Sequence, residues 1–287
     1  MISVATFTAI VNQLLPEPHA GLLNGILFGT KATLSKELTN ALVATGTLHI
    51  VALSGMNITI LESLIGSTLL PVIGKRWASA ATIILIIGFI WLVGPSPSVI
   101  RAGIMGSMAL IATIFGKQRW GLFFFGLTVA VMLIIHPAWI GNLSFQLSAL
   151  ATLGLILFGG NYKKKMVDGK QKLVMENRNW KLDLSFLQFP FSEQLISLLK
   201  ITLAAQVFTI PLIFFTFRRI SLISPLTNVL IGWLIQPLTA LGLVTAILGW
   251  VSLPLGQVAA WAAWVFLQYL ITVIELTAKI PFSSLGW

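Results

Sequence analysis

The chain has 287 residues, of which 57% are hydrophobic and only 9% are charged. Soluble globular domains carry about 25% charged residues, so this composition excludes an ordinary soluble domain and predicts an integral membrane protein. Lys and Arg outnumber Asp and Glu by 18 to 8, which gives a formal net charge of +10. The basic loops of a membrane protein explain such an excess, and a polyanionic partner or an anionic membrane surface is the alternative explanation.

The residue types that most metal and covalent chemistry needs are scarce. The chain has no Cys, which excludes disulfides, thiolate chemistry and Cys-ligated metal. His19, His49 and His136 lie far apart, and no HExxH or DxD cluster is present. The sequence therefore predicts no metal and no cofactor. The first residues lack the basic region of a signal peptide.

Long apolar segments predict an all-α fold, that of a polytopic helical membrane protein with about seven to ten membrane helices, including broken or re-entrant ones. The segments are too long for the alternating strands of a barrel. The expected helices cover residues 2–15, 41–73, 78–94, 99–115, 121–135, 138–158, 195–217, 222–250 and 254–279. The first is too short to span a membrane, and the second is too long for one straight span. We expect the second to consist of two half-helices, and the one over 222–250 to be broken as well.

Basic and uncharged turns alternate along the first half of the chain. The basic ones are Lys75-Arg76, the turn from Lys117 to Arg119, and residues 159–183. The positive-inside rule places basic turns in the cytoplasm, so residues 159–183 are predicted to be a basic cytoplasmic loop. The pair Arg218-Arg219 then falls on the opposite side, which indicates either that the expected number of crossings is wrong by one or that the pair has a role other than topology.

The stretch HIVALSGMN, residues 49–57, places polar groups inside a long apolar run. Such groups cost free energy unless they are paired or face water. The Ser54-Gly55 pair favours a helix break at Gly55, and a broken helix at membrane depth must be buried in protein or line a cavity. His49 and Ser54 also suggest a base and a nucleophile. They lie about 140° apart round a helix, however, and no acid is placed to orient the His.

Arg101 lies one turn after Pro97, near the start of a predicted helix. An Arg in a membrane segment either has a functional partner inside the bundle or reaches back to the interface. Pro97 and Pro211 are further expected helix breaks.

Amide side chains mark the remaining candidates. Gln146 lies four residues after Asn142 and so shares a helical face with it, and Asn228 lies in a later apolar helix. Such residues either bond helices to one another or line a pathway. The sequence leaves both roles open.

Four patches together resemble the ComEC family of competence DNA-uptake channels. They are GTLHIVALSGMNI at 46–58, GPSPSVIRAGIM at 94–105, GNLSFQLSALATLGL at 141–155, and a series from Pro211 through Asn228 to Pro237. The resemblance covers nearly the whole chain. It implies that residues 1–287 are a single membrane-embedded competence domain. Neither the OB-like nor the metallo-β-lactamase-like domain of full-length members is visible.

The resemblance implies a multi-pass channel in the bacterial cytoplasmic (inner) membrane that translocates single-stranded DNA during natural competence and is not an enzyme. Such a strand needs a wet, weakly cationic path with donors that do not trap it. The residues expected to line the pore or DNA path are His49, Ser54, Asn57, Arg101, Gln146, Arg218, Arg219 and Asn228. The expected partners are single-stranded DNA and membrane lipids, with a separate nuclease and a cytoplasmic ATPase or DNA-binding protein as further candidates.

Two other functions would use some of the same residues. A transporter of an anionic lipid-linked or small phosphorylated substrate needs the buried Arg101 but no continuous pore. An intramembrane hydrolase would centre on Ser54, although it lacks an evident acid and oxyanion site.

Overall fold

A computed structural model describes residues 3–30, 34–51, 55–115, 121–158, 191–217, 219–221, 223–280 and 284–286. Its helices are α1 (Val4–Leu14), α2 (His19–Phe28), α3 (Lys36–Ala44), η1 (Leu48–Ile50), α4 (Gly55–Val93), α5 (Pro97–Ile114), α6 (Gly121–Ile135), η2 (Pro137–Gly141), α7 (Leu143–Phe158), α9 (Phe191–Phe217), α10 (Ser224–Val251) and α11 (Leu253–Ala278). Two short strands, β1 (Arg219–Ser221) and β2 (Ser284–Gly286), pair antiparallel. The predicted helical fold is confirmed.

Four of these helices are long and apolar enough to cross a membrane. The candidate spans are Thr68–Val93, Leu199–Thr216, Ser224–Val251 and Leu253–Ala278. Five shorter apolar helices accompany them: α1, α2, α5, α6 and α7. Long and short helices together lie within the expected number of membrane helices, and the short ones pack against neighbouring helices, α1 against α10 and α6 against α5 and α7.

The N-terminal half of the predicted 41–73 segment differs from the expected pair of half-helices. Helix α3 ends at Ala44, a short 3-10 turn follows as η1, and α4 begins at Gly55. Helix α4 then continues past residue 73 to a kink at Gly74, where φ is 77° and ψ is 167°. Glycine adopts this left-handed conformation without the strain that a Cβ would cause. The kink divides α4 into two helical pieces.

The prolines act differently from one another. Pro97 is the first residue of α5, a position where its missing N–H removes no helical hydrogen bond. Pro211 was expected to break a helix but lies inside α9, which continues to Phe217. Helix α10 likewise runs through Pro237 without a break. A membrane helix tolerates such a proline because neighbouring helices and local adjustment satisfy the freed carbonyl.

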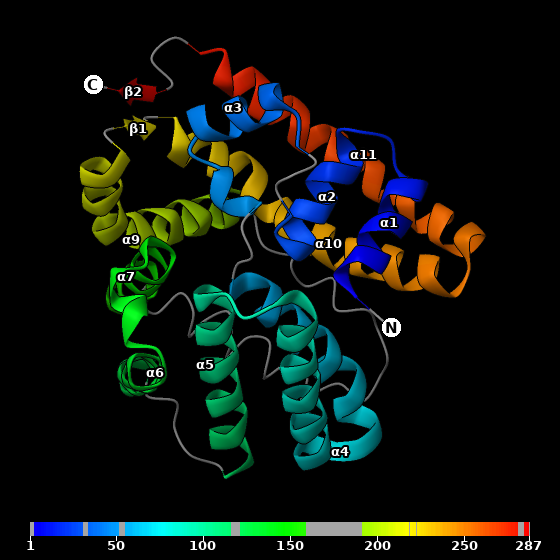
Figure 1. The fold of residues 1–287 in the computed structure, drawn as a ribbon, viewed down its shortest axis with the longest axis vertical. Helices are drawn as coiled ribbons and strands as arrows, with labels where there is room; N and C mark the ends of the chain where they lie inside the picture. Colours follow the sequence, from blue (N-terminus) through cyan, green and yellow to red (C-terminus); the bar gives the residue numbers. More distant parts are fainter. Residues whose placement is uncertain are drawn as a thin grey trace.

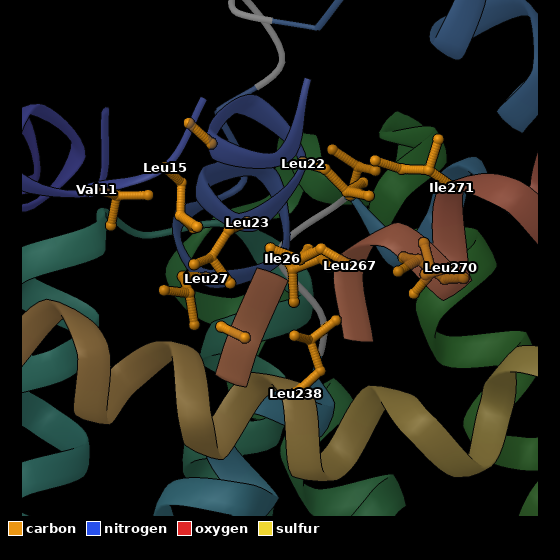
Figure 2. Close-up of a cluster of buried hydrophobic side chains, with 14 of the residues drawn as sticks. Val11, Leu15, Leu22, Leu23, Ile26, Leu27, Leu238, Leu267, Leu270 and Ile271 are labelled. Carbon is orange, nitrogen blue, oxygen red and sulfur yellow. The ribbon is translucent and has the colours of Figure 1, made fainter. Parts of the chain in front are cut away.

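Buried side chains of the described residues form two clusters. The larger one joins α1, α2, α3 and η1 to α10 and α11. Helix α2 is buried along its whole length, and in Figure 2 its Leu22, Leu23 and Leu27 face Leu238 of α10 and the leucines of α11. The smaller cluster contains Ile58, Ile86 and Val99 and holds both pieces of α4 against α5. In Figure 1, α4 and α5 stand side by side, away from α1 and α11.

Small residues allow two pairs of helices to touch through their backbones. A Cβ added at Gly154 of α7 would overlap the carbonyl oxygen of Ala204 on α9. A Cβ added at Gly256 of α11 would lie 2.5 Å from the Cα of Gly249 on α10. In a bilayer no hydrophobic driving force brings helices together, because the lipid is as apolar as their side chains. Close packing of this kind holds the helices together instead. The α7–α9 crossing also positions the candidate site.

Candidate functional site

Arg101 is a half-buried cation where α4, α5 and α7 meet. Its Nη1 donates to the carbonyl of Ser148 and to Oγ1 of Thr152, both on α7. On the other side, a Cβ added at Gly55 would lie 3.2 Å from Arg101 Nη2, so the guanidinium reaches the first residue of α4. Both acceptors that the described residues give Arg101 are neutral oxygens, and its Nε is buried without a hydrogen bond. Within the described ranges, the positive charge therefore has neutral hydrogen-bond acceptors and no negatively charged one.

A second group of polar side chains lies where the loop between α3 and η1 meets the start of α10. Gln206 Nε2 and Asn228 Nδ2 both donate to Ser224 Oγ, at 3.2 and 3.3 Å. Gly46 packs so closely here that an added Cβ would lie 2.9 Å from Ser224 Cβ, and its φ of +67° also favours glycine. His49 is exposed, and its Nδ1 donates to the Gly46 carbonyl at 3.1 Å. The fold thus brings the predicted residues His49 and Asn228 into one group.

The α7–α9 crossing connects the two groups. Thr152, which contacts Arg101, lies two residues before Gly154, and Gly154 touches Ala204, which lies two residues before Gln206. The two groups therefore lie on one pair of crossing helices, α7 and α9, at different faces of each helix. We call the members of both groups the polar junction: Gly46, His49, Gly55, Arg101, Ser148, Thr152, Gln206, Ser224 and Asn228.

Two other predicted residues use their amides to hold the fold together. Asn57 is 3% exposed, and its Nδ2 donates to the carbonyls of Ile26 and Leu27 at 2.8 and 3.5 Å. These are carbonyls of the last turn of α2, which have no partner within the helix. Gln146 Nε2 donates to the Ile140 carbonyl at 2.8 Å and ties α7 to η2. Neither amide belongs to the polar junction.

The other predicted residues lie outside the described residues or at the edge of a described segment. Ser54, Arg218 and the basic loop over residues 159–183 lie outside the described residues. Arg219 is the first residue of β1, where its backbone pairs with Gly286. The last residue of β1 is Ser221, whose Cβ would lie 3.0 Å from a Cβ added at Gly46. Arg219 therefore lies two residues before Ser221, which is close to Gly46 of the polar junction.

Sequence reasoning missed Thr152, Ser224 and Gly46. Single hydroxyl residues in apolar helices carry little signal, because they commonly bond back to a carbonyl of their own helix. Ser148 and Thr152 lie one helical turn apart and so form a polar face on one helix. This spacing was the feature of the sequence that could have indicated acceptors for Arg101. Among the described residues, no three His, Asp or Glu side chains are grouped as metal ligands. The junction combines one cation with neutral donors and acceptors, a composition that suits reversible binding of an anion.

Comparison with known proteins gives two matches. The model of the Competence protein family matches residues 26–287, a range that includes the whole polar junction. ComE operon protein 3 of Bacillus subtilis (strain 168) is 22% identical over 223 residues, which is 77% of this chain. The chain spans only about a quarter of the length of that relative, since the match covers 25% of it. No solved structure matches the chain significantly.

Proposed function

The chain belongs to the Competence protein family, and on that premise we propose that it conducts single-stranded DNA across the bacterial cytoplasmic membrane. The path passes the polar junction, and conduction involves no covalent step. Arg101, whose recorded acceptors are only neutral oxygens, is the observation that carries this proposal.

A cation in an apolar helix is costly unless an opposite charge or strong hydrogen bonds offset the lost hydration. At Arg101 the described residues supply two neutral acceptors and leave a buried Nε without one. A backbone phosphate of a passing strand supplies both the negative charge and the acceptors. Because one guanidinium neutralises about one phosphate, the strand is attracted without being trapped.

The neutral part of the junction supports the same function. Gln206, Asn228 and Ser224 form a hydrogen-bonded group without a charge, and the His49 ring is exposed beside it. Amides and hydroxyls offer donors and acceptors to any base or phosphate without strong preference. A conduit for DNA of arbitrary sequence needs this lack of discrimination. We assign strand cutting and energy supply to other proteins, a separate nuclease and a cytoplasmic ATPase or DNA-binding protein.

The test is oligonucleotide binding by the purified protein in nanodiscs, measured by the anisotropy of a fluorescent oligo-dT across a range of salt concentrations. We expect Arg101→Gln to weaken binding and to reduce the slope of log K against log salt by about 0.7, the value for one phosphate contact with a single strand. Arg76→Gln removes the same charge from an exposed position at the kink of α4 and serves as the matched control.

Uptake in cells completes the test. Arg101→Gln at normal membrane abundance should lower transformation of a competent host that depends on this protein. Wild-type binding and wild-type uptake by Arg101→Gln would contradict the proposal. Binding of anionic lipid or inorganic phosphate with no response to oligonucleotide would instead favour a transporter of a small or lipid-linked phosphorylated substrate.

A further inference from the structure

We infer that His49 uses Nε2 of its ring as a hydrogen-bond acceptor for the N–H donors of unpaired DNA bases. The inference rests on the proposed function and adds a second kind of contact to the same path: Arg101 meets the phosphate backbone, and His49 meets the bases.

The turn that precedes His49 is fixed by backbone hydrogen bonds at the end of α3. The N–H of Gly46 donates to the Val43 carbonyl at 3.1 Å, and the N–H of Thr47 donates to the Leu42 carbonyl at 2.9 Å. This pair of bonds is the Schellman motif, in which one residue adopts the left-handed conformation. Gly46 is that residue, with a φ of 67°. The backbone from Leu42 to Thr47 is therefore held in one conformation.

The residues around this motif continue the rigid turn up to His49. The hydroxyls of Thr45 and Thr47 are 2.7 Å apart and hydrogen-bonded, and both residues are fully buried. The N–H of Ile50 donates to the Thr47 carbonyl at 2.9 Å and closes the 3-10 turn η1, in which His49 lies. His49 thus lies on a turn that is anchored before it and after it.

The bond to Gly46 determines which ring nitrogen of His49 carries the hydrogen. A carbonyl oxygen can only accept, so Nδ1, 3.1 Å from the Gly46 oxygen, carries the N–H. In a neutral imidazole the other nitrogen, Nε2, is then an acceptor. Among the described residues, the recorded hydrogen bond of this ring is the one from Nδ1. Because His49 is exposed, a strand can reach the Nε2 side of the ring.

A neutral acceptor distinguishes between the parts of a DNA strand. The phosphodiester groups and the deoxyriboses along the chain have no N–H or O–H, so they cannot donate to Nε2. Every base has an N–H on its Watson–Crick edge: adenine at N6, cytosine at N4, guanine at N1 and N2, and thymine at N3. In a duplex these edges are turned inward and paired, whereas in a single strand they are open. The contact at His49 therefore accepts any base but requires an unpaired one.

A purely structural role of His49 would involve Nδ1 alone. The bond from Nδ1 to Gly46 stabilises the turn whether or not DNA is present. Nε2 takes no part in that bond. An experiment that separates the two nitrogens therefore separates the structural role from the proposed one.

The experiment compares two fluorescent probes on the full chain in nanodiscs: oligo-dT, and the same oligonucleotide built from N3-methylthymidine. Thymine has a single N–H, and methylation at N3 removes it without changing the charge of the strand. The measurement is made at pH 8, where an imidazole is neutral because its ordinary pKa is about 6.5. We expect the wild type to bind the methylated probe about three- to tenfold more weakly, the loss of one neutral hydrogen bond. The salt slopes for the two probes should be equal.

Two variants of His49 assign this preference to Nε2. His49→Asn places an amide nitrogen where Nδ1 was and ends short of the Nε2 position, so it keeps a donor for the Gly46 carbonyl. We expect it to bind the two probes within about twofold of each other. His49→Phe keeps a ring and lacks both nitrogens; it should behave in the same way and serves as the second variant should His49→Asn fold poorly. His136→Asn changes another exposed histidine, in the turn before η2, and should keep the wild-type preference.

Equal affinity of the wild type for the two probes overturns the inference. A wild-type preference that persists in folded His49→Asn or His49→Phe, or one that is also lost in His136→Asn, overturns it as well. The proposed function survives each of these results, provided that Arg101→Gln still loses affinity and salt slope. No effect of Arg101→Gln on oligo-dT binding refutes the proposed function itself.

Discussion

Replacing Asn57 by Leu separates a structural role of this residue from a role in the DNA path. Leu keeps the branched shape of Asn and removes the donor. The Ile26 carbonyl, 2.8 Å from Asn57 Nδ2, would then lack its recorded partner at the end of a fully buried helix. An unsatisfied buried carbonyl costs about 1–3 kcal/mol. The bond to Leu27, at 3.5 Å, is too long to add much.

We therefore expect a loss of about 2 kcal/mol, equivalent to a fall of roughly 4–8 °C in the unfolding midpoint of a chain of this size. The assay is thermal unfolding in detergent followed by tryptophan fluorescence, with Asn40→Leu on the exposed face of α3 as the control. Oligo-dT binding by the folded fraction should stay within about twofold of wild type. An unchanged midpoint together with weaker oligonucleotide binding would refute the reasoning and return Asn57 to the DNA path.

Two pairs of glycines give further predictions. Gly154→Ala should destabilise the protein by about 3 kcal/mol, because the added Cβ meets the Ala204 carbonyl, a backbone atom that cannot rotate away. A Cβ added at Gly126 on α6 has nothing within 4 Å, so Gly126→Ala should be neutral or up to about 1 kcal/mol stabilising. Equal unfolding midpoints for Gly154→Ala and Gly126→Ala would contradict this expectation. Gly46→Ala should lower both the midpoint and oligo-dT binding. Gly94 also has a positive φ but lies in open space, so Gly94→Ala should cost only the backbone strain of about 1–2 kcal/mol. Equal effects of Gly46→Ala and Gly94→Ala on oligo-dT binding would count against a role of the polar junction in binding DNA.

Long apolar runs bounded by turn residues were predicted well from sequence. Helix α6 has the predicted bounds, 121–135, and α11 ends within one residue of the predicted 254–279. Their apolar composition and length leave few alternatives in a membrane. Prediction from the sequence failed where tertiary packing determines the local backbone conformation. Pro211 and Pro237 both suggest breaks, yet α9 and α10 continue through them.

For the candidate site, the sequence identified polar and charged side chains that are costly to bury in an apolar helix. It did not identify the groups to which they bond. An Arg inside an apolar helix is visible in the sequence, whereas its acceptors on Ser148 and Thr152 depend on how α5 meets α7. His49 and Asn228 were both selected, and only the fold shows that Gly46 and Ser224 bring them near each other. The structural contact of Asn57 could not be predicted, because its partner, Ile26, lies on another helix 31 residues away.

The contact between Gly249 and Gly256 has a consequence for how α10 and α11 are arranged. Helices α10 and α11 are joined by Ser252 alone, and their backbones touch right beside that residue. A turn of one residue keeps the two helices next to each other, so α10 and α11 form one helical hairpin. The close approach of their backbones depends on two residues without side chains, and a larger residue at 249 or 256 would force the helices apart at the turn.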